Sequence, residues 1–437
     1  MTLSTSSRVV VPGGALRGEL RPPPDKSITH RAVFLAALAQ GTSRIVHPLV
    51  ADDCERSAEA FRTLGVSIES NPKGEWIVVG RGLYGLREPA GDHLYCGNSG
   101  TTLRLIAGVL AGQPFATKLM GDKSLSNRPM ARVVDPLVKM GAEITARKGC
   151  LAPLHVHGRR PLRAIEWKSP VASAQVKSCV LLAGLYAEGT STVEEPFRSR
   201  DHTERMLSAA GIRLTIDERR VSVAGGQTLK PQDWVVPSDI SSAAFFMVAA
   251  LIAPGSELML RNVNTNPTRD GVLEVLEKMG ASIHRERSLV AGGEPITDLL
   301  IRHGGLRGTT FGADIMPRLV DEVPILALAA TQAEGVTEIR GAGELRVKES
   351  DRLAHIAKGL SAMGAQVEEL PDGLRLTGPT PLKGALLDSA GDHRLAMTFA
   401  VAGLIARGET QIANADCVDI SYPTFWQDLE RLRVQSS

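Results

Sequence analysis

Apolar residues recur along the chain in six Ala-rich segments, each ending at a glycine that β-forming residues follow. Successive glycines lie 66 to 80 residues apart, at Gly41, Gly112, Gly189, Gly255, Gly335 and Gly408. A glycine just beyond an apolar helix is the expected C-cap, because it adopts a positive φ without a Cβ penalty. The pattern predicts six apolar helices, one in each copy of a repeat of about 70 residues.

A second glycine recurs in the same phase, after segments in which polar and apolar residues mix. Each of these glycines predicts the end of a mixed helix: Gly65, Gly141, Gly211, Gly280 and Gly364. The residues that follow alternate, as in Ala142-Glu143-Ile144-Thr145, which is typical of a strand. A sixth copy, Phe425 to Val434, lacks the glycine. Helix, strand, helix and strands in every copy predict an α/β fold.

Composition narrows the possible partners of this protein. The chain has 437 residues, which suggests two to three domains, and its net charge of +2 and 4% aromatic content argue against nucleic-acid binding. The longest apolar run, Ala243 to Ala253, is too short to span a bilayer. Five scattered cysteines argue against a disulfide framework and against zinc, so no metal is expected. A cytoplasmic location is the expectation.

Several predicted helices begin with cations, which the positive end of a helix dipole disfavours. Asp25 is expected to cap a helix that has Lys26 in its first turn, and Arg394 follows Asp392 in the same way. Arg128 directly precedes Pro129, and the helix opened by residues 346–352 has Lys348 and Arg352 four apart on one face. Each cation alone could be a solvated surface charge. Together they predict a small ligand with several negative charges.

Two carboxylates and three short polar motifs complete the candidate chemistry. Asp321 precedes a predicted helix, and Glu349 lies between two cations, so each could serve in proton transfer or be structural, as a cap or a salt-bridge partner. Gly97 to Thr102 could be a backbone anion cradle or an ordinary capped turn. The Ser and Gln of Ser173 to Gln175 could orient a polyol, but this segment and Arg200 to Thr203 could each equally be a capped turn.

Taken together, these motifs closely resemble those of the 3-phosphoshikimate 1-carboxyvinyltransferase (EPSP synthase) family of enolpyruvyl transferases. The resemblance covers residues 8 to 434 in the family's order and rests on Asp25-Lys26-Ser27 with Arg31, Gly97-Asn98 with Gly100-Thr101, Asn127-Arg128-Pro129, Ser173 with Gln175, Arg346 to Arg352, and Asp392-His393-Arg394. It implies two similar domains, each an inside-out α/β barrel of three βαβαββ units with pseudo-threefold symmetry. Residues 1–23 and 238–437 would form one domain and residues 24–237 the other, with the active site in the cleft between them.

The resemblance also implies a reaction and roles for individual residues. The enzyme would transfer the enolpyruvyl group of phosphoenolpyruvate to the 5-hydroxyl of shikimate 3-phosphate in the shikimate pathway, without a cofactor and as a monomer. Asp321, Glu349 and Lys26 would be catalytic. Shikimate 3-phosphate would be held by Lys26, Ser27, Arg31, Ser173, Ala174, Gln175, Arg200, Asp321 and Lys348. Phosphoenolpyruvate would be held by Lys26, Gly100, Arg128, Gln175, Arg352 and Arg394.

Two other functions are alternatives to the transfer onto shikimate 3-phosphate. The sister enzyme that acts on UDP-N-acetylglucosamine usually has a Cys in the loop corresponding to Gly121–Asn127, where this chain has none. A non-catalytic anion-binding protein on the same scaffold would not need the Asp321 and Glu349 pair.

Glyphosate competes with phosphoenolpyruvate in this family, and tolerant members often have Ala at the position of Gly100. Glycine at position 100 therefore predicts that glyphosate inhibits this enzyme, although the segment Arg200 to Thr203 resembles the branch that includes glyphosate-tolerant enzymes.

Overall fold

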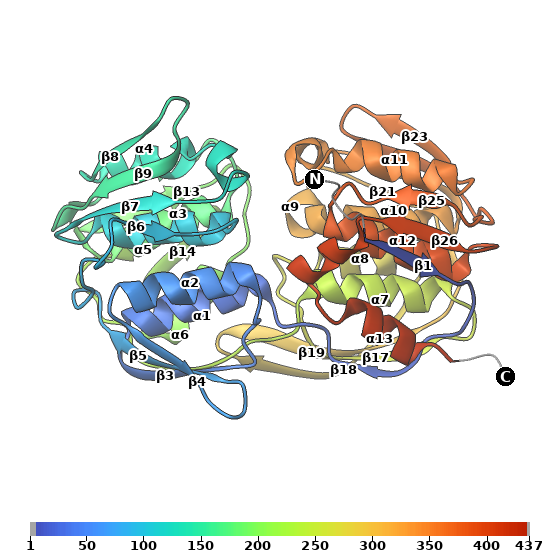
Figure 1. The fold of residues 1–437 in the computed structure, drawn as a ribbon, viewed down its shortest axis with the longest axis horizontal. Coiled ribbons are helices and arrows are strands. Elements are labelled where there is room, and N and C mark those ends of the chain that lie inside the picture. The colour runs from blue at the N-terminus through green and yellow to red at the C-terminus, as the bar shows by residue number, and fades with distance from the viewer. Residues whose placement is uncertain (1–5, 435–437) are drawn as a thin grey trace. The chain divides into compact units, whose positions relative to one another are not determined.

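The structure, a computed structural model, describes residues 6–434 and divides into two compact units (Figure 1). The central unit contains residues 24–237 and the short segment 290–294, and the terminal unit contains residues 6–23, 238–289 and 295–434. Both ends of the chain therefore contribute to the terminal unit. In Figure 1 the blue strand β1 (Ser7–Val10) lies beside the red strand β26 (Thr410–Ala413), with which it pairs antiparallel.

The central unit has three four-stranded sheets, each built in the same way. Their strand orders are β16 (Asp233–Val235), β3 (Gln40–Val46), β5 (Trp76–Arg81), β4 (Ser67–Ser70); β6 (His93–Tyr95), β7 (Ala116–Met120), β9 (Leu151–His157), β8 (Glu143–Arg147); and β11 (Glu166–Lys168), β13 (Thr190–Glu194), β15 (Arg220–Ala224), β14 (Leu214–Asp217). In each sheet the first two strands are parallel and the others antiparallel. The strand β10 (Leu162–Arg163) pairs with β12 (Ala187–Glu188) beside them.

Two helices accompany each of these sheets, because parallel neighbours need a crossover connection. The apolar helices are α1 (Lys26–Leu38), α3 (Gly100–Ala111) and α5 (Ala174–Gly184), and the mixed ones are α2 (Asp52–Thr63), α4 (Ala131–Lys139) and α6 (His202–Ala209). The order β-α-β-α-β-β thus occurs three times. In the first copy the leading strand is β16, which comes from the C-terminal end of the unit and pairs with β3.

The terminal unit repeats this plan. Its sheets are β2 (Arg17–Leu20), β17 (Glu257–Asn264), β19 (Glu294–Arg302), β18 (Ser282–Ala291); β20 (Leu306–Arg307) with β21 (Thr310–Phe311), β22 (Ala333–Ile339), β24 (Gly373–Gly378), β23 (Gln366–Leu370); and β25 (Leu386–Asp388), β26, β1. Its apolar helices are α7 (Ile240–Ile252), α10 (Val323–Thr331) and α12 (His393–Ile405); the others are α8 (Gly271–Lys278), α9 (Met316–Leu319), α11 (Arg352–Ala362) and α13 (Phe425–Leu432). The predicted α/β fold of two similar halves with three repeats each is confirmed.

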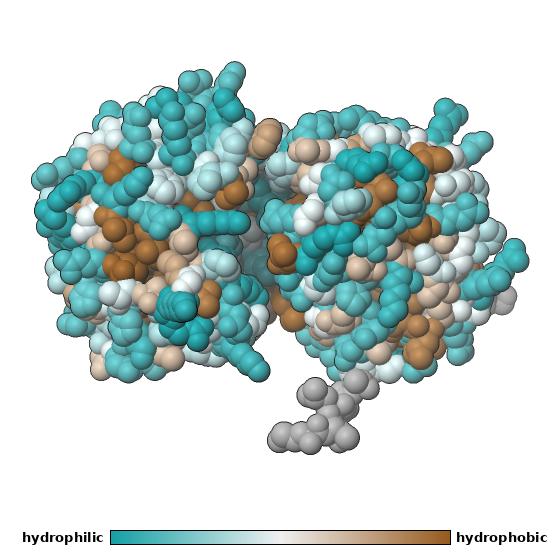
Figure 2. Space-filling model, turned by 90° about the horizontal axis from the view of Figure 1, so that it is seen from above, coloured by the Kyte–Doolittle hydropathy of each residue, from teal (hydrophilic) through white to brown (hydrophobic). Residues whose placement is uncertain are grey.

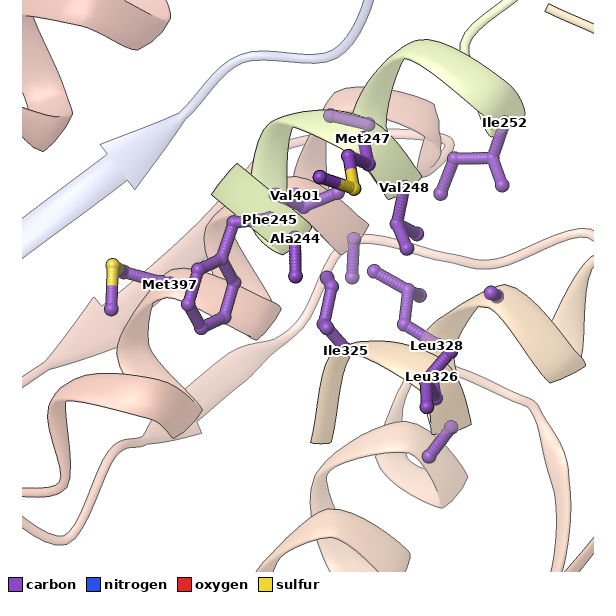
Figure 3. Packing of buried hydrophobic residues seen from close by; sticks show 14 of the residues in the cluster. Ala244, Phe245, Met247, Val248, Ile252, Ile325, Leu326, Leu328, Met397 and Val401 are labelled. Atoms are coloured by element: carbon purple, nitrogen blue, oxygen red, sulfur yellow. The ribbon is translucent and has the colours of Figure 1, made fainter. Parts of the chain in front are cut away.

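The core of the terminal unit forms where its three apolar helices meet. Figure 3 shows side chains of α7, α10 and α12 converging, among them Phe245, Ile325 and Met397, each at most 1% exposed. All thirteen residues of α7 are buried. A helix that is apolar on every side is stable only inside a core. The Ala-rich pattern of these segments therefore reflects burial on all sides.

The two series of glycines have different roles. All five glycines of the second series have φ between 85° and 102° and follow the C-cap residue of a mixed helix, as at Gly65 after α2. There the Gly65 N–H donates to the Arg62 carbonyl and the Val66 N–H to the Phe61 carbonyl, which is a Schellman arrangement. This part of the prediction is confirmed.

The first series was wrongly predicted to cap the apolar helices. Gly112 is the C-cap residue of α3 but has φ −93°, so it is not left-handed. The other five have positive φ, yet they lie two to four residues beyond the C-cap, as Gly41 does after Ala39. Ala39 is already extended, at φ −74° and ψ 156°, because the chain passes directly from the buried helix into a strand. The left-handed residue is therefore needed at the start of the strand.

A short segment of the hairpin β18–β19 groups with the central unit, which the predicted boundaries did not include. There Glu294 Oε1 lies 2.8 Å from Nδ1 of the buried His202 ring, within hydrogen-bond distance. A Cβ built on Gly293 would meet the Arg205 carbonyl oxygen at 2.8 Å, and Gly293 has φ 85°. The close approach and the positive φ both require glycine at this turn.

Hydrophilic residues cover most of the face shown in Figure 2, with smaller apolar areas between them. Within residues 6–434, none of the helices has both the length and the apolar character that a bilayer crossing requires.

Candidate active site

The predicted site residues fall into one cluster in each unit. The central unit holds Lys26, Ser27, Arg31, Gly100, Arg128, Ser173, Ala174, Gln175 and Arg200; the terminal unit holds Asp321, Lys348, Glu349, Arg352 and Arg394. Most lie at or just before the N-termini of helices. These ends carry unpaired backbone N–H groups and partial positive charge.

Three capped helix N-termini form the frame of the central cluster. The Asp25 carboxylate accepts from the Ile28 N–H at 2.9 Å, so the predicted cap of α1 is confirmed. The Ser99 and Ser173 hydroxyls cap α3 and α5. Ala174 is the first residue of α5, and Arg200 is half-buried in the loop before α6. Each cap uses one N–H and leaves others available for an anion.

Lys26 is the first residue of α1 and lies on the surface of the cluster. Its Nζ donates to Asp53 Oδ2 at 3.1 Å, and its side chain is 32% exposed. Burial is the largest single influence and acts to raise the pKa of Asp53, but the charge and hydrogen bond of Lys26, together with smaller contributions from His30 and Arg128, lower the pKa overall. Lys26 is therefore a partly exposed cation next to a carboxylate that stays ionised.

Gly100 begins α3 between two guanidinium groups. A Cβ built on it would lie 2.9 Å from Nη1 of Arg104 and 3.5 Å from Nη1 of Arg128. Arg104 Nη1 donates to Gln175 Oε1 at 2.7 Å, and Gln175 Nε2 donates to Thr101 Oγ1 at 2.9 Å. Burial lowers the pKa of Arg104 to about 10, and the charge of Arg128 adds to this. Two cations beside a helix N-terminus favour the binding of an anion here.

The position of Arg128 differs from the prediction. Helix α4 begins at Ala131, three residues after Arg128, and Pro129 lies outside it. Arg128 instead ends a short 3-10 helix, Leu125–Asn127, and its Nη2 donates to Asn98 Oδ1 at 2.7 Å and to Ser124 Oγ at 3.2 Å. The side chain is thus directed by its hydrogen bonds to Asn98 and Ser124.

Arg31 is buried, with 4% exposure, on the second turn of α1. Its Nε donates to Thr203 Oγ1 at 2.7 Å, its Nη1 to the Ser27 carbonyl at 2.9 Å and its Nη2 to Ser178 Oγ at 3.0 Å. Burial lowers its pKa to about 10. The guanidinium is held rigidly between α1, α5 and α6, so it presents a fixed positive charge beneath Ser27.

In the terminal unit, three carboxylates surround Arg352, which begins α11 with 1% exposure. Its Nε donates to Asp392 Oδ2 at 2.7 Å and its Nη2 to Glu349 Oε2 at 2.6 Å, while its Nη1 is 3.6 Å from Asp321 Oδ1. Burial alone would lower the pKa of Arg352, but Glu349, Asp392 and Asp321 outweigh it and the pKa is raised. One guanidinium therefore brings both candidate acid–base carboxylates together.

Asp321 lies in the 3-10 helix Val320–Glu322, immediately before α10, with its side chain 17% exposed. It does not cap α10, whose N-cap residue is Glu322, so the structural role considered for it as a cap is not what the structure shows. Arg394 Nη1 donates to the Asp321 carbonyl at 3.1 Å, and its Nη2 is 3.8 Å from Asp321 Oδ2. Arg269 Nη1 lies 3.9 Å from the same oxygen.

Behind Asp321 lies a carboxyl group that is fully enclosed. The side chain of Glu322 has no exposed surface, and its Oε1 accepts a hydrogen bond from Ser241 Oγ. Arg269 Nη2 donates to Ser241 Oγ at 2.6 Å and is 3.8 Å from Glu322 Oε1. Burial raises the pKa of Glu322. Arg269, Ser241 and Glu322 thus form a rigid polar layer under the candidate base.

Lys348 is not on a helix with Arg352, contrary to the prediction. A 3-10 helix covers Gly343–Val347, and α11 begins only at Arg352. Lys348 Nζ donates to Glu344 Oε1 at 2.7 Å, with the lysine side chain 27% exposed. The cap residue Asp351 accepts from the Ala354 N–H at 3.1 Å, which starts the helix after the basic segment. Lys348 therefore lies in a loop, whereas Arg352 lies at a helix N-terminus.

The chain matches the family model of EPSP synthase (3-phosphoshikimate 1-carboxyvinyltransferase) over residues 10–429. The 3-phosphoshikimate 1-carboxyvinyltransferase of Desulforamulus reducens is 51% identical over 98% of this chain and 99% of its own length, and that of Bacillus subtilis is 48% identical over 96% and 98%. The EPSP synthase structure from Acinetobacter baumannii superposes with a TM-score of 0.93 at 42% identity, over 99% of both chains. The chain belongs to the EPSP synthase family.

Membership in the EPSP synthase family gives the two polar clusters a common context. Substrates of the kind these enzymes are named for carry phosphate and carboxylate groups. Each unit offers a partly exposed cation, Lys26 at the start of α1 and Lys348 in the loop before α11. The candidate carboxylates Asp321 and Glu349 lie among such cations in the terminal unit.

Several side chains of the two clusters were missed in the sequence. Arg104 could have been found, because it lies four residues after Gly100 and hence on the same face of α3. Two acidic residues are typical of helix starts and gave no further signal: Asp53 in the first turn of α2, and Glu322 next to Asp321. Arg269 carries no sequence signal, because only the tertiary fold places it beside Asp321 and Glu322.

Proposed function

We propose that this protein is an enolpyruvyl transferase that joins phosphoenolpyruvate to the 5-hydroxyl of shikimate 3-phosphate and releases phosphate. The observation that carries the proposal is the cluster around Arg352, which holds Asp321 and Glu349 close together in a chain that matches the EPSP synthase family from residue 10 to 429. A binding protein would need the cations but not a pair of carboxylates suited to proton transfer.

The two substrates divide the binding residues between them. Shikimate 3-phosphate is assigned to Lys26, Ser27, Arg31, Ser173, the backbone of Ala174, Gln175, Arg200, Asp321 and Lys348. Phosphoenolpyruvate is assigned to Lys26, Gly100, Arg128, Gln175, Arg352 and Arg394. The paired guanidinium groups beside Gly100 support an anion at the start of α3. The assigned residues come from both units.

The chemistry assigns one proton transfer to each carboxyl group. Glu349 gives a proton to the methylene carbon of phosphoenolpyruvate, and the neighbouring carbon becomes cationic. The 5-hydroxyl oxygen attacks that carbon while Asp321 accepts its proton, which forms a tetrahedral intermediate. The new methyl group then returns a proton to Glu349, phosphate leaves with the proton that Asp321 had accepted, and the enol ether remains.

Side chains of the two clusters favour these steps by electrostatics and positioning. Arg352 and Arg394 lie within 4 Å of Asp321, so they can hold the anionic groups of phosphoenolpyruvate and the departing phosphate beside the candidate base. The side chain of Glu349 is 44% exposed, so its carboxyl group is accessible to a substrate. Closure of the site around the substrates would exclude water and strengthen each of these interactions.

The test is phosphate release with phosphoenolpyruvate and each candidate acceptor. Release with shikimate 3-phosphate and none with UDP-N-acetylglucosamine is expected. Release with the UDP-sugar alone would indicate the sister activity, and binding of both anions without release would indicate a binding protein. The loop Gly121–Asn127, which lacks a cysteine, argues against the UDP-sugar. A monomeric state and a cytoplasmic location remain predictions.

A further inference from the structure

A buried carboxylate in the central unit connects two segments that both carry assigned substrate ligands. Glu195 follows β13 directly and is 4% exposed. Its Oε1 accepts from the Ser173 N–H at 2.8 Å, just before α5. Its Oε2 accepts from the Ser199 hydroxyl at 2.8 Å and from the Ser199 N–H at 3.3 Å. One side chain thus holds the residue that caps α5 and the residue that precedes Arg200.

The charge of Glu195 is balanced inside the unit by Lys177 of α5. Lys177 is 1% exposed, and its Nζ lies 3.0 Å from Glu195 Oε2 and 2.7 Å from Glu204 Oε1. The same Nζ donates to the Ser199 carbonyl at 3.3 Å. The three donors of the ammonium group are therefore all directed to named acceptors. An ion pair this well satisfied holds its partners in one geometry.

The connection reaches only part of the central cluster. Gln175 is held separately, by Arg104 and Thr101 of α3. Arg31 is held by Thr203 and Ser178. Ser173 and the loop before α6, in contrast, donate hydrogen bonds to the Glu195 side chain. Loss of the Glu195 charge should therefore disturb the Ser173 and Arg200 segments first.

We propose that Glu195, with Lys177 as its counter-ion, is a positioning residue that sets the Ser173 and Arg200 segments for the phosphorylated acceptor substrate. The proposal rests on the proposed function, because those segments matter only if they bind shikimate 3-phosphate. Glu195 does not touch substrate itself. It acts through the backbone at Ser173 and through Ser199.

The sharpest perturbation is Glu195→Gln, which keeps the size of the side chain but adds an N–H₂ group. Every partner of Glu195 is a donor, so one carbonyl oxygen must replace two oxygens and the amide faces a donor. Hydrogen bonds to a charged group are the strong ones, so the KM for shikimate 3-phosphate should rise at least about tenfold. The KM for phosphoenolpyruvate should change less than about threefold, because Gln175 and Arg128 are held elsewhere.

The matched control is Glu204→Gln. Glu204 is equally buried and also pairs with Lys177, but it is not hydrogen-bonded to the Ser173 or Ser199 backbone in the described residues. It should lower the unfolding temperature without raising the KM for shikimate 3-phosphate. An equal rise in both variants would show a general loosening of the unit and would overturn the proposal. Ser199→Ala removes only the hydroxyl donor and should raise the same KM a few-fold; no change would also overturn it, even if Glu195→Gln does not fold.

Amide hydrogen exchange tests the positioning without any substrate. The Ser173 and Ser199 amides should exchange faster in Glu195→Gln and unchanged in Glu204→Gln. Unchanged exchange in Glu195→Gln refutes the positioning role whatever the enzyme does. If the wild-type protein shows no turnover with shikimate 3-phosphate, the proposed function fails instead, and the exchange result still decides whether Glu195 orders the two segments.

Discussion

Replacement of Gly100 by alanine tests how the start of α3 distinguishes phosphoenolpyruvate from longer anions such as glyphosate. The added methyl carbon would lie 2.9 Å from Nη1 of Arg104, whereas ordinary contact begins at 3.4 Å. Arg104 must therefore retreat by about 0.5 Å. Its Nη1 is hydrogen-bonded to Gln175, which is assigned to both substrates, so the shift is passed on to the site.

The magnitude follows from the cost of overpacking. One extra methyl group in a close-packed site costs about 1–3 kcal/mol, which is roughly 5- to 150-fold in an inhibition constant for a ligand that needs the space. Phosphoenolpyruvate is shorter than glyphosate, so the added methyl group takes less of the space that it needs. We expect the inhibition constant of glyphosate to rise at least about tenfold and the KM for phosphoenolpyruvate to rise only a few-fold. The backbone of Gly100 is not left-handed, so alanine is tolerated there and the unfolding temperature should not fall.

The assay is phosphate release at saturating shikimate 3-phosphate, with phosphoenolpyruvate and glyphosate varied for both proteins. Competitive inhibition of the unmodified enzyme is expected. Equal increases in the inhibition constant and in the KM would show that the methyl group does not discriminate between the two anions. If the unmodified enzyme is already indifferent to glyphosate, Gly100 does not control sensitivity and the steric argument is wrong.

Three further outcomes follow from the two clusters. Asp321→Asn and Glu349→Gln should each lower kcat by about 10²–10⁴-fold with substrate binding largely kept; near-normal turnover in stopped assays would remove that residue from the chemistry. Shikimate 3-phosphate with an inhibitor should reduce the radius of gyration in small-angle scattering, because an anion draws cations of both units together; an unchanged radius argues against closure. Glu322→Gln should stabilise the protein at pH 8 more than at pH 4 in urea unfolding. Burial raises the pKa of Glu322 above its ordinary 4.5, so the cost of ionising it in the folded state is absent below pH 4.5 and grows as the pH rises; an equal effect at both pH values would refute this.

The repeat and its local signals are determined by the sequence alone. Glycines such as Gly65 and Gly141 mark helix ends because the Schellman arrangement needs a left-handed residue at one defined position. Asp25 marks a helix start because its side chain reaches the backbone N–H of Ile28 without help from the rest of the protein. These interactions span a few residues, so the local sequence is sufficient to specify them.

Only the tertiary structure decided which side chains meet. Asp321 and Asp392 lie 31 and 40 residues from Arg352 in the chain, yet all three share one guanidinium group. Gln175 reaches Arg104 across 71 residues. Five of the six apolar helices ended before the expected glycine, as α1 does at Ala39 before Gly41. Helices α4 and α11 began later than expected, at Ala131 and Arg352. Long-range contacts of this kind depend on how the repeated helices and strands close around a core, and no short stretch of sequence contains that information.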